Sequence, residues 1–308
     1  MFPPLLMAPM LDITNRAFRT LVRGYGGCGL FYTEMLNARR LPTESAQSPF
    51  WQGLGVERDV MVQLLGDDPE ALARSVERLL PLDPFGFDWN LGCARKKITH
   101  WGWGAALLEN PQATARGLRA LRQATDKPLT VKIRLPEHGH PDLFKSFIKL
   151  LENEGVDAIT VHARTAADGF KRPARWDAIA QVKSWTKVPV IGNGDVQSAA
   201  DAQAMFQKTG CDAVMIGRGA VGKPYLFKTI INQASGATEP APEAAKVLEA
   251  MLTCLDTALE TPKGAREFKV FCRYFAQTLP VPHWFWAPLQ SMTLGPELAK
   301  RARVFFKK

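Results

Sequence analysis

The stretch VPVIGNGDVQSAADAQAMFQKTGCDAVMIGRGA, Val188 to Ala220, contains two short apolar runs with a helical pattern between them. The two runs, Val188 to Asn193 and Ala213 to Gly217, have the length and the apolar content of buried strands. Between them, Ser198 to Lys208 repeats its apolar residues with helical spacing. A buried strand, a helix and a second buried strand in this order predict a parallel β-α-β unit.

The same unit recurs toward the N-terminus. Further strand-like runs lie at Leu5–Met10, Gly29–Glu34, Val60–Leu65, Phe87–Asn90, Leu129–Leu135 and Ala158–His162, and helical patterns lie at Pro69–Leu80, Pro111–Ala124, Leu143–Glu154 and Trp176–Trp185. With the two runs above, these make eight strands of an α/β fold. Eight strand-helix units favour a (β/α)8 TIM barrel, and a doubly wound open sheet is the alternative.

The pattern changes after residue 234. Ser235 to Ala244 is a Pro/Ala-rich linker, and only helical patterns follow it, interrupted at Pro262 and across Leu279 to Pro288. We therefore predict a TIM-barrel domain over residues 1–234, followed by a small all-helical C-terminal domain over residues 243–308.

Composition limits the class of protein. A chain of 308 residues with 46% hydrophobic content can bury a large core. No run of about 18 apolar residues occurs, and the start MFPPLLMAPMLD lacks the features of a secretory signal, so we expect no membrane span and a cytoplasmic location. Five cysteines without a C-x-x-C pair predict reduced thiols and no metal site. The net charge of +9 indicates either a polyanionic partner, such as nucleic acid, or only a well-solvated surface.

Polar residues gather at the predicted carboxyl ends of the strands. They are Gln63, Asn90, Cys93, Lys132, Arg134, His162, Arg164, Asn193, Asp195 and Arg218. Active sites of TIM barrels lie at this edge. An unpaired lysine inside LTVKIRL would cost several kcal/mol in a core, so either a ligand or an internal partner must meet Lys132.

The last two strand ends read GNGDV and GRGAV. In TIM barrels the loops after the seventh and eighth strands commonly bind a phosphate. Glycines allow close approach of the backbone to an anion, and Arg218 adds a charged donor. We therefore expect a phosphate site at Asn193, Gly194 and Asp195 together with Gly217 and Arg218.

Eight short motifs follow one another along the predicted barrel: APM (8–10), TEM (33–35), VQLLG (62–66), DWNLGC (88–93), KIR (132–134), VHART (161–165), GNGD (192–195) and VMIGRGA (214–220). In sequence and order they resemble the motifs of the tRNA-dihydrouridine synthases, flavin-dependent enzymes that reduce a uracil base in folded RNA. The segment REFKVFCRYF, residues 266–275, is similar to the basic helix of that family's RNA-binding domain.

The resemblance implies a cofactor and a reaction. FMN would lie across the barrel mouth, bound by Pro9, Met10, Gln63, Lys132 and His162, with its phosphate at Asn193, Gly194, Asp195, Gly217 and Arg218. NADPH would reduce the FMN, FMN N5 would deliver a hydride to uracil C6, and Cys93 would donate a proton to C5. Thiols are mostly protonated at neutral pH, so a cysteine can act as this acid.

The resemblance also implies a tRNA partner and a monomeric enzyme. The expected substrate contacts are Asn90, Arg134 and Arg164 at the base, with Arg95, Lys96 and Lys97 at phosphates. In the helical domain, the expected phosphate contacts are Arg266, Lys269, Arg273, Lys300, Arg301 and Arg303.

The cysteine loop departs from the family pattern. Ala94 stands where the family usually has proline, and Trp101 and Trp103 stand where it has small residues. The tryptophans either stack on bases of the RNA or pack under the loop. Two other functions stay open: a flavin oxidoreductase acting on a free pyrimidine, and an RNA-binding flavin barrel with lost or altered catalysis. Cys93 would in the last case be a small buried apolar residue.

Overall fold

The computed structural model describes residues 2–45, 48, 53–137 and 140–307. These residues form two compact units. The barrel unit lies within residues 1–9, 29–196 and 201–216, and the helical unit consists of residues 10–28, 197–200 and residues from 217 onward. In the part of the chain so described, no helix combines the length and the apolar character needed to cross a bilayer, and no group of three or more His, Cys, Asp or Glu side chains is placed to hold a metal ion.

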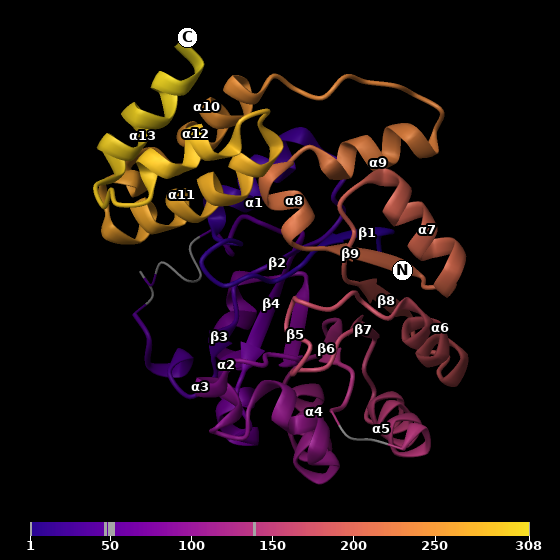
Figure 1. Ribbon diagram of the computed structural model, residues 1–308. Helices are drawn as coiled ribbons and strands as arrows, with labels where there is room; N and C mark the ends of the chain where they lie inside the picture. Colours follow the sequence, from indigo (N-terminus) through magenta and orange to yellow (C-terminus); the bar gives the residue numbers. More distant parts are fainter. Residues whose placement is uncertain (1, 46–47, 49–52, 138–139, 308) are drawn as a thin grey trace. The chain divides into compact units, whose positions relative to one another are not determined.

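The barrel unit is built on parallel strands (Figure 1). They are β1 Leu5–Met7, β2 Phe31–Tyr32, β3 Leu36–Asn37, β4 Val60–Leu65, β5 Gly86–Leu91, β6 Leu129–Arg134, β7 Ala158–His162, β8 Val190–Asn193 and β9 Ala213–Ile216. Eight of them follow the order β1-β9-β8-β7-β6-β5-β4-β2, and β3 pairs with the far end of β4. A bridge between Leu6 and Leu30 brings β1 next to the start of β2 and nearly closes the ring. The predicted TIM barrel is therefore confirmed, and the open sheet is not formed.

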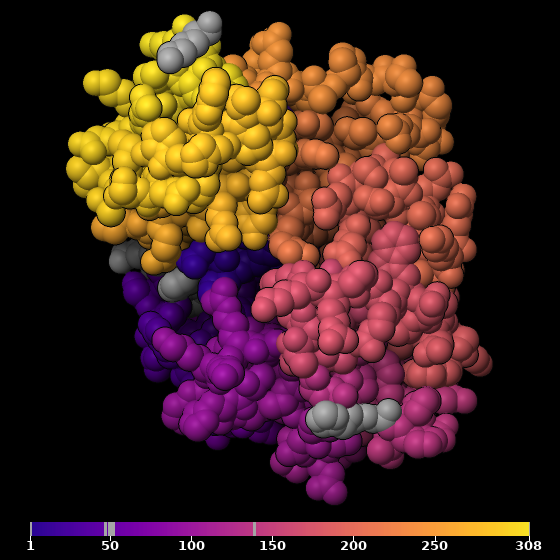
Figure 2. All heavy atoms as spheres, in the orientation of Figure 1, coloured from indigo at the N-terminus to yellow at the C-terminus, as the bar shows by residue number. Residues whose placement is uncertain are grey.

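Helices cover the outside of these strands, as Figure 1 shows, and the all-atom view in Figure 2 shows them as a closely packed outer surface. They are α2 Pro69–Leu79, α4 Pro111–Ala124, α5 Pro141–Asn153, α6 Trp176–Trp185 and α7 Ala199–Thr209. Side-chain caps start two of them, because Asp68 accepts from the Glu70 amide and Asn110 from the Ala113 amide. All five predicted helices are confirmed to within a few residues at their ends.

The interior of the barrel is divided into an apolar part and a polar part. An apolar cluster contains Leu6, Ala8, Leu30, Tyr32, Met61, Ala158, Ile191, Ala213 and Met215. Side chains two residues apart on a strand share a face. The register therefore places Gln63, Asp88, Thr130, Lys132 and Thr160 inside the barrel as well, nearer the carboxyl ends of β4 to β7. This polar part begins the site.

The helical unit contains α1 Arg16–Tyr25, α8 Arg218–Gly222, α9 Leu226–Ala234, α10 Ala244–Leu255, α11 Pro262–Phe275, α12 Pro282–Trp286 and α13 Gly295–Val304. Aromatic rings form its core, with Phe271 and Phe275 stacked at 5.3 Å and Phe285 edge-on to Phe275 at 5.6 Å. The expected linker lies between α9 and α10. The ranges 1–234 and 243–308 stay a prediction, since α1, α8 and α9 group with the later helices by contacts and Met1 and Lys308 lie outside the described residues.

Candidate active site

A buried carboxylate lies at the centre of the polar part. Asp88, on β5, is 0% exposed. It accepts hydrogen bonds from Gln63 Nε2 at 2.7 Å and from Thr130 Oγ1 at 2.5 Å. Burial raises the pKa of Asp88 to about 6, although both hydrogen bonds oppose this shift. The bond from Nε2 fixes the orientation of the Gln63 amide, whose carbonyl then accepts from Asn90 Nδ2 at 2.8 Å.

The side chain of Asn90 holds the loop that carries the candidate acid. Its Oδ1 accepts from the amide of Gly92 at 3.1 Å and from the amide of Cys93 at 2.8 Å. Arg134 Nε donates to the Gly92 carbonyl at 2.8 Å. A continuous series of hydrogen bonds thus leads from Asp88 through Gln63 and Asn90 to the backbone of Cys93. The amide of Asn90, expected to meet the base, is turned toward its own loop.

A second contact fixes Cys93 from the other side. Ala105 N donates to the Cys93 carbonyl at 3.0 Å. The neighbouring Gly104 has φ +61°, and a Cβ there would lie 2.6 Å from the Cys93 carbonyl oxygen. Only glycine tolerates both conditions, so the turn can close against Cys93 because residue 104 lacks a side chain. The cysteine itself is half-buried.

The two tryptophans of this turn have different surroundings. Trp103 is 7% exposed, donates from Nε1 to Asp67 Oδ1 at 2.6 Å and lies under the guanidinium of Arg39 at 5.1 Å from the ring centre. Trp101 is 62% exposed. Of the two alternatives, packing under the loop therefore describes Trp103, whereas the ring of Trp101 stays open to solvent.

Lys132 points toward a neutral partner. Its Nζ donates to Asn193 Oδ1 at 2.9 Å, and Asn193 Nδ2 donates to the Met215 carbonyl at 2.8 Å. Desolvation lowers the pKa of Lys132 to about 7, and the charge of Arg134 adds to this effect while Asp88 opposes it. Within the described ranges no carboxylate forms an ion pair with this lysine. The sequence predicts either a ligand or an internal partner for Lys132, and the internal partner is the Asn193 amide.

Arg164, which is buried, and Asp195, which is half-buried, form an ion pair just after the ends of β7 and β8. Arg164 Nη2 lies 2.6 Å from both carboxylate oxygens of Asp195, and its Nε donates to the Arg172 carbonyl at 2.6 Å. Its third nitrogen, Nη1, lies 3.2 Å from His162 Nε2. All three nitrogens of Arg164 are thus engaged internally. Its expected contact with the substrate stays a prediction.

Most of the expected site residues belong to the barrel unit, where they form several groups of hydrogen bonds. Gln63, Asn90, Lys132, Arg134, His162, Arg164, Asn193, Gly194 and Asp195 lie with Cys93 and Pro9 in the barrel unit, while Met10, Gly217 and Arg218 belong to the helical unit. Arg95, Lys96 and Lys97 are exposed at the short helix α3 Lys96–Thr99. Sequence reasoning missed Asp88 and Gly104. The position of Asp88 two residues before Asn90 on one strand was a usable signal, since it places both on the interior face.

In the helical unit, some expected RNA contacts already serve the fold. Lys269 Nζ donates to the carbonyls of Gln290 and Met292, and Arg303 binds the Glu249 carboxylate through two bonds of 2.7 and 2.8 Å. Arg266 Nη2 lies 3.1 Å from Asp12 Oδ1. By contrast, Arg273, Lys300 and Arg301 are exposed.

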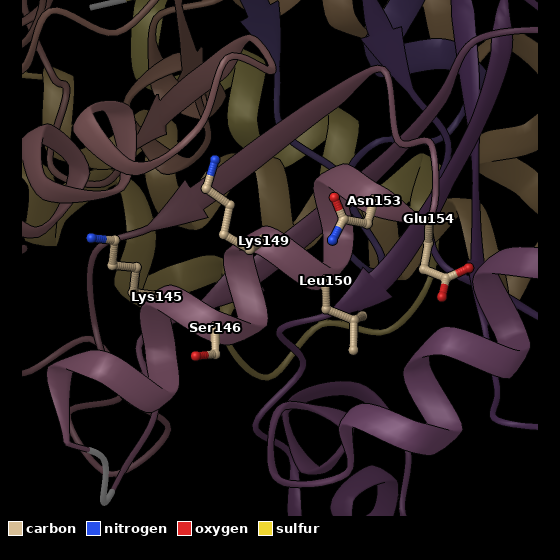
Figure 3. A pocket seen from close by; sticks show the side chains of 6 residues that line it. All are labelled: Lys145, Ser146, Lys149, Leu150, Asn153 and Glu154. Carbon is tan, nitrogen blue, oxygen red and sulfur yellow. The ribbon is translucent and has the colours of Figure 1, made fainter.

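A shallow groove along α5 belongs to none of these groups. Figure 3 shows its side chains, Lys145, Ser146, Lys149, Leu150, Asn153 and Glu154. Two of them are paired nearby, Lys149 with Glu152 at 2.6 Å and Glu154 with Arg119 at 2.6 Å. The groove contains no residue of the site predicted from sequence.

The sequence is similar to a known protein family and to several of its members. The family model described as dihydrouridine synthase (Dus) matches residues 6–285. A probable tRNA-dihydrouridine synthase of Rickettsia prowazekii is 34% identical over 260 residues, which cover 83% of this chain and 79% of the relative. The tRNA-dihydrouridine synthase B of Pseudomonas aeruginosa is 31% identical over 307 residues, or 98% of this chain and 92% of the relative.

Solved structures give a broader likeness. A histamine dehydrogenase from Rhizobium sp. 4-9 superposes with a TM-score of 0.58 at 12% identity, over 82% of this chain and 49% of that one. A 2-naphthoyl-CoA reductase in complex with 2-naphthoyl-CoA gives 0.60 at 12% identity, over 86% and 56%. The chain thus spans about half the length of these two proteins, and at such identity the likeness shows the fold alone.

The family model and the relatives agree with the motifs. They confirm the prediction that the chain is an enzyme, an oxidoreductase of the flavin-dependent tRNA-dihydrouridine synthase class. The match spans the barrel and continues into the helices as far as residue 285. The chain therefore belongs to the dihydrouridine synthase family.

Proposed function

We propose that the chain reduces the C5=C6 bond of a specific uridine in tRNA, with FMN as its cofactor and NADPH as the reductant. The observation that carries this proposal is the loop of Cys93. Asn90, Arg134 and Ala105 hold its backbone at the end of β5 by hydrogen bonds of 2.8 to 3.0 Å. Such fixation is what an acid needs if it is to donate a proton to one carbon of a bound base.

Several polar groups inside the barrel support FMN as the cofactor. Lys132 is half-buried and has a neutral amide partner, and in its protonated form it can bind an electron-rich ring edge. Gln63, His162 and Asn193 add polar groups, and Pro9 and Met10 add apolar surface. Within the barrel unit, Asn193, Gly194 and Asp195 would bind the phosphate, and Gly194 and Asp195 have positive φ. When bound, FMN supplies the hydride for C6 and receives its electrons from NADPH.

The residues of the chain then complete the reduction. Cys93 donates the thiol proton to C5, and the resulting thiolate regains a proton from water. Arg134 holds the loop through Nε and has Nη2 without a hydrogen bond among the described residues, so Nη2 can donate to a carbonyl of the base. Asn90 and Arg164 position other groups, because their polar atoms are engaged internally.

RNA binding follows from charge. Arg95, Lys96 and Lys97 are exposed two to four residues after Cys93, and Arg273, Lys300 and Arg301 are exposed in the helical unit. Cations of this kind bind phosphates, and the affinity should fall steeply with salt. The uridine must leave its stack to reach a thiol on one side and a reductant on the other, which costs a few kcal/mol.

Two measurements test the proposal. Mass-spectrometric mapping of dihydrouridine should show one or more uridines that stay unreduced in tRNA from cells lacking this chain. The purified Cys93→Ala variant should keep its flavin absorbance and lose the product. Reduction of free uridine at the rate found for tRNA would favour a free-pyrimidine reductase, and a yellow wild-type protein that binds tRNA without product would favour the RNA-binding flavin barrel.

A further inference from the structure

The exposed ring of Trp101 is unusual for its place in the fold. It is 62% exposed, whereas Trp103, two residues later, is 7% exposed. A single exposed apolar side chain is common at protein surfaces, and Trp101 is distinguished by its surroundings. The position is also one where the chain departs from the small residues typical of its family.

The backbone that carries Trp101 is rigid. His100, Trp101, Gly102 and Trp103 each donate an amide hydrogen bond of 2.9 to 3.3 Å to the preceding turn formed by Lys96, Ile98 and Thr99. The ring of Trp101 leans on that of Trp103 at 6.4 Å and on the edge of His100 at 6.0 Å. Asp67 and Arg39 fix Trp103, so one of the two rings beside Trp101 is itself held in place.

The same turn is attached to the cysteine loop. The amide of Ala105 binds the Cys93 carbonyl at 3.0 Å, and the backbone of Gly104 lies against the same residue. A base stacked on Trp101 would therefore lie at the rim of the loop that carries the acid. This places it next to the bound uridine along a polynucleotide, and not at the uridine itself.

The residues around Trp101 carry positive charge, which favours binding of a polyanion. No acidic residue occurs between Asp88 and Glu109, whereas Arg95, Lys96 and Lys97 occur there and are exposed. The carboxylate of Asp67, which contacts the turn through Trp103, is already shared with Arg39. A flat aromatic ring beside exposed cations is the combination that binds unpaired nucleotides, the ring by stacking and the cations by phosphate contacts.

We propose that Trp101 is a stacking platform for a base of single-stranded RNA adjacent to the target uridine. It determines which RNA context the enzyme accepts and does not take part in the chemistry. This inference rests on the proposed function, since it requires an RNA substrate. Tryptophan suits this role because its large ring has few rotatable bonds to order on binding.

The test compares RNA binding by Trp101→Ala, Trp101→Leu and Trp101→Phe. The probes are an unmodified tRNA transcript and a single-stranded heptamer of uridylate. Trp101→Ala should raise both Kd values at least about fivefold, and Trp101→Phe should retain most of the affinity. Trp101→Leu, which is apolar but has no ring, should bind like Trp101→Ala. Titration with RNA should quench the tryptophan fluorescence of the wild type more than that of Trp101→Phe.

Salt dependence separates stacking from charge. The slope of log affinity against log salt should be unchanged in Trp101→Ala, because the indole is neutral, and shallower by about 0.7 in Lys97→Ala.

The control variant is Leu143→Ala, which removes another exposed apolar side chain, 68% exposed on α5. It should bind RNA as the wild type does. Binding by Trp101→Ala within twofold of the wild type overturns the proposal, and so does equal binding by the leucine and phenylalanine variants. Loss of RNA affinity in Trp101→Ala, with no dihydrouridine formed by the wild type, would keep the platform and reject the proposed function.

Discussion

Replacement of Asn90 by alanine tests whether this side chain acts on the loop or on the substrate. The change removes four hydrogen bonds at once, one of them a long contact from Nδ2 to Met35 Sδ at 3.9 Å. Asn90 Nδ2 no longer meets the Gln63 carbonyl at 2.8 Å, and Asn90 Oδ1 no longer accepts from the amides of Gly92 and Cys93 at 3.1 and 2.8 Å. The Cys93 loop then keeps only its bonds to Arg134 and Ala105.

The size of the effect follows from the burial of each group. Gln63 is 1% exposed, so water cannot reach its carbonyl, and an unsatisfied buried acceptor costs about 1–3 kcal/mol. Gly92 and Cys93 are half-buried, and water can partly replace the lost acceptor. We expect the free energy of unfolding to fall by roughly 2–4 kcal/mol in all. A displacement of the thiol by about 1 Å should lower kcat about 100-fold.

The assay measures kcat and KM for dihydrouridine formation on unmodified tRNA, with the Kd for RNA in parallel. For Asn90→Ala we expect the loss in kcat and less than a threefold change in Kd. Asn90→Asp, which keeps an oxygen acceptor for the two amides, should restore part of kcat. Asn110→Ala, which removes the cap of α4, should cost about 1 kcal/mol and leave kcat unchanged. A raised KM and Kd with unchanged kcat would refute the reasoning and place Asn90 at the base.

Two further changes test the groups on either side of this loop. Asp88 has a folded-state pKa of about 6, above its unfolded value, so its contribution to stability is complete below about pH 4 and is lost as the pH rises through about 6. Asp88→Asn should abolish this slope, which amounts to about 2 kcal/mol in urea unfolding between pH 4 and pH 7; an unchanged slope would show that Asp88 titrates normally. Gly104→Ala combines positive φ with a Cβ 2.6 Å from the Cys93 carbonyl and should lower both Tm and kcat, whereas Gly210→Ala, with φ +64° and nothing within 4 Å, should lower Tm only. Equal kcat values in the two glycine variants would show that Gly104 does not affect the position of Cys93.

The fold was predictable where apolar residues repeat over a long segment. The prediction gives α4, α6, β4 and β7 with their observed bounds, since each has a clear period and a clear start. The two-residue strand β3 has too few residues to show any period. Helix α1 is absent from the prediction although a signal existed, because Asn15 precedes it and accepts the Phe18 amide as an N-cap does.

The site was predictable in its residues and less so in their partners. Strand-end position alone selects Asn90, Lys132 and Arg164. The contacts of these side chains depend on the register between neighbouring strands and on side-chain rotamers. The spacing of residues in the sequence predicts neither. Asn90 turns toward Cys93 because β4 brings Gln63 next to it. The different surroundings of Trp101 and Trp103 depend on Asp67, which lies in another loop.

The polar part of the barrel interior argues for function independently of the motifs. Asp88, Thr130, Lys132 and Thr160 lie on strands β5 to β7, where apolar residues would fill the barrel with less desolvation. Thr160 Oγ1 is buried and has no hydrogen-bond partner in the described part of the chain, and the desolvation of Lys132 lowers its pKa to about 7. A sequence shaped by stability alone would not retain such groups on one side of a core whose other side is apolar. Thr130 and Asp88 are connected through Gln63 and Asn90 to the backbone of Cys93, and the presence of these polar groups inside the barrel is explained if they serve a bound ring and its reaction.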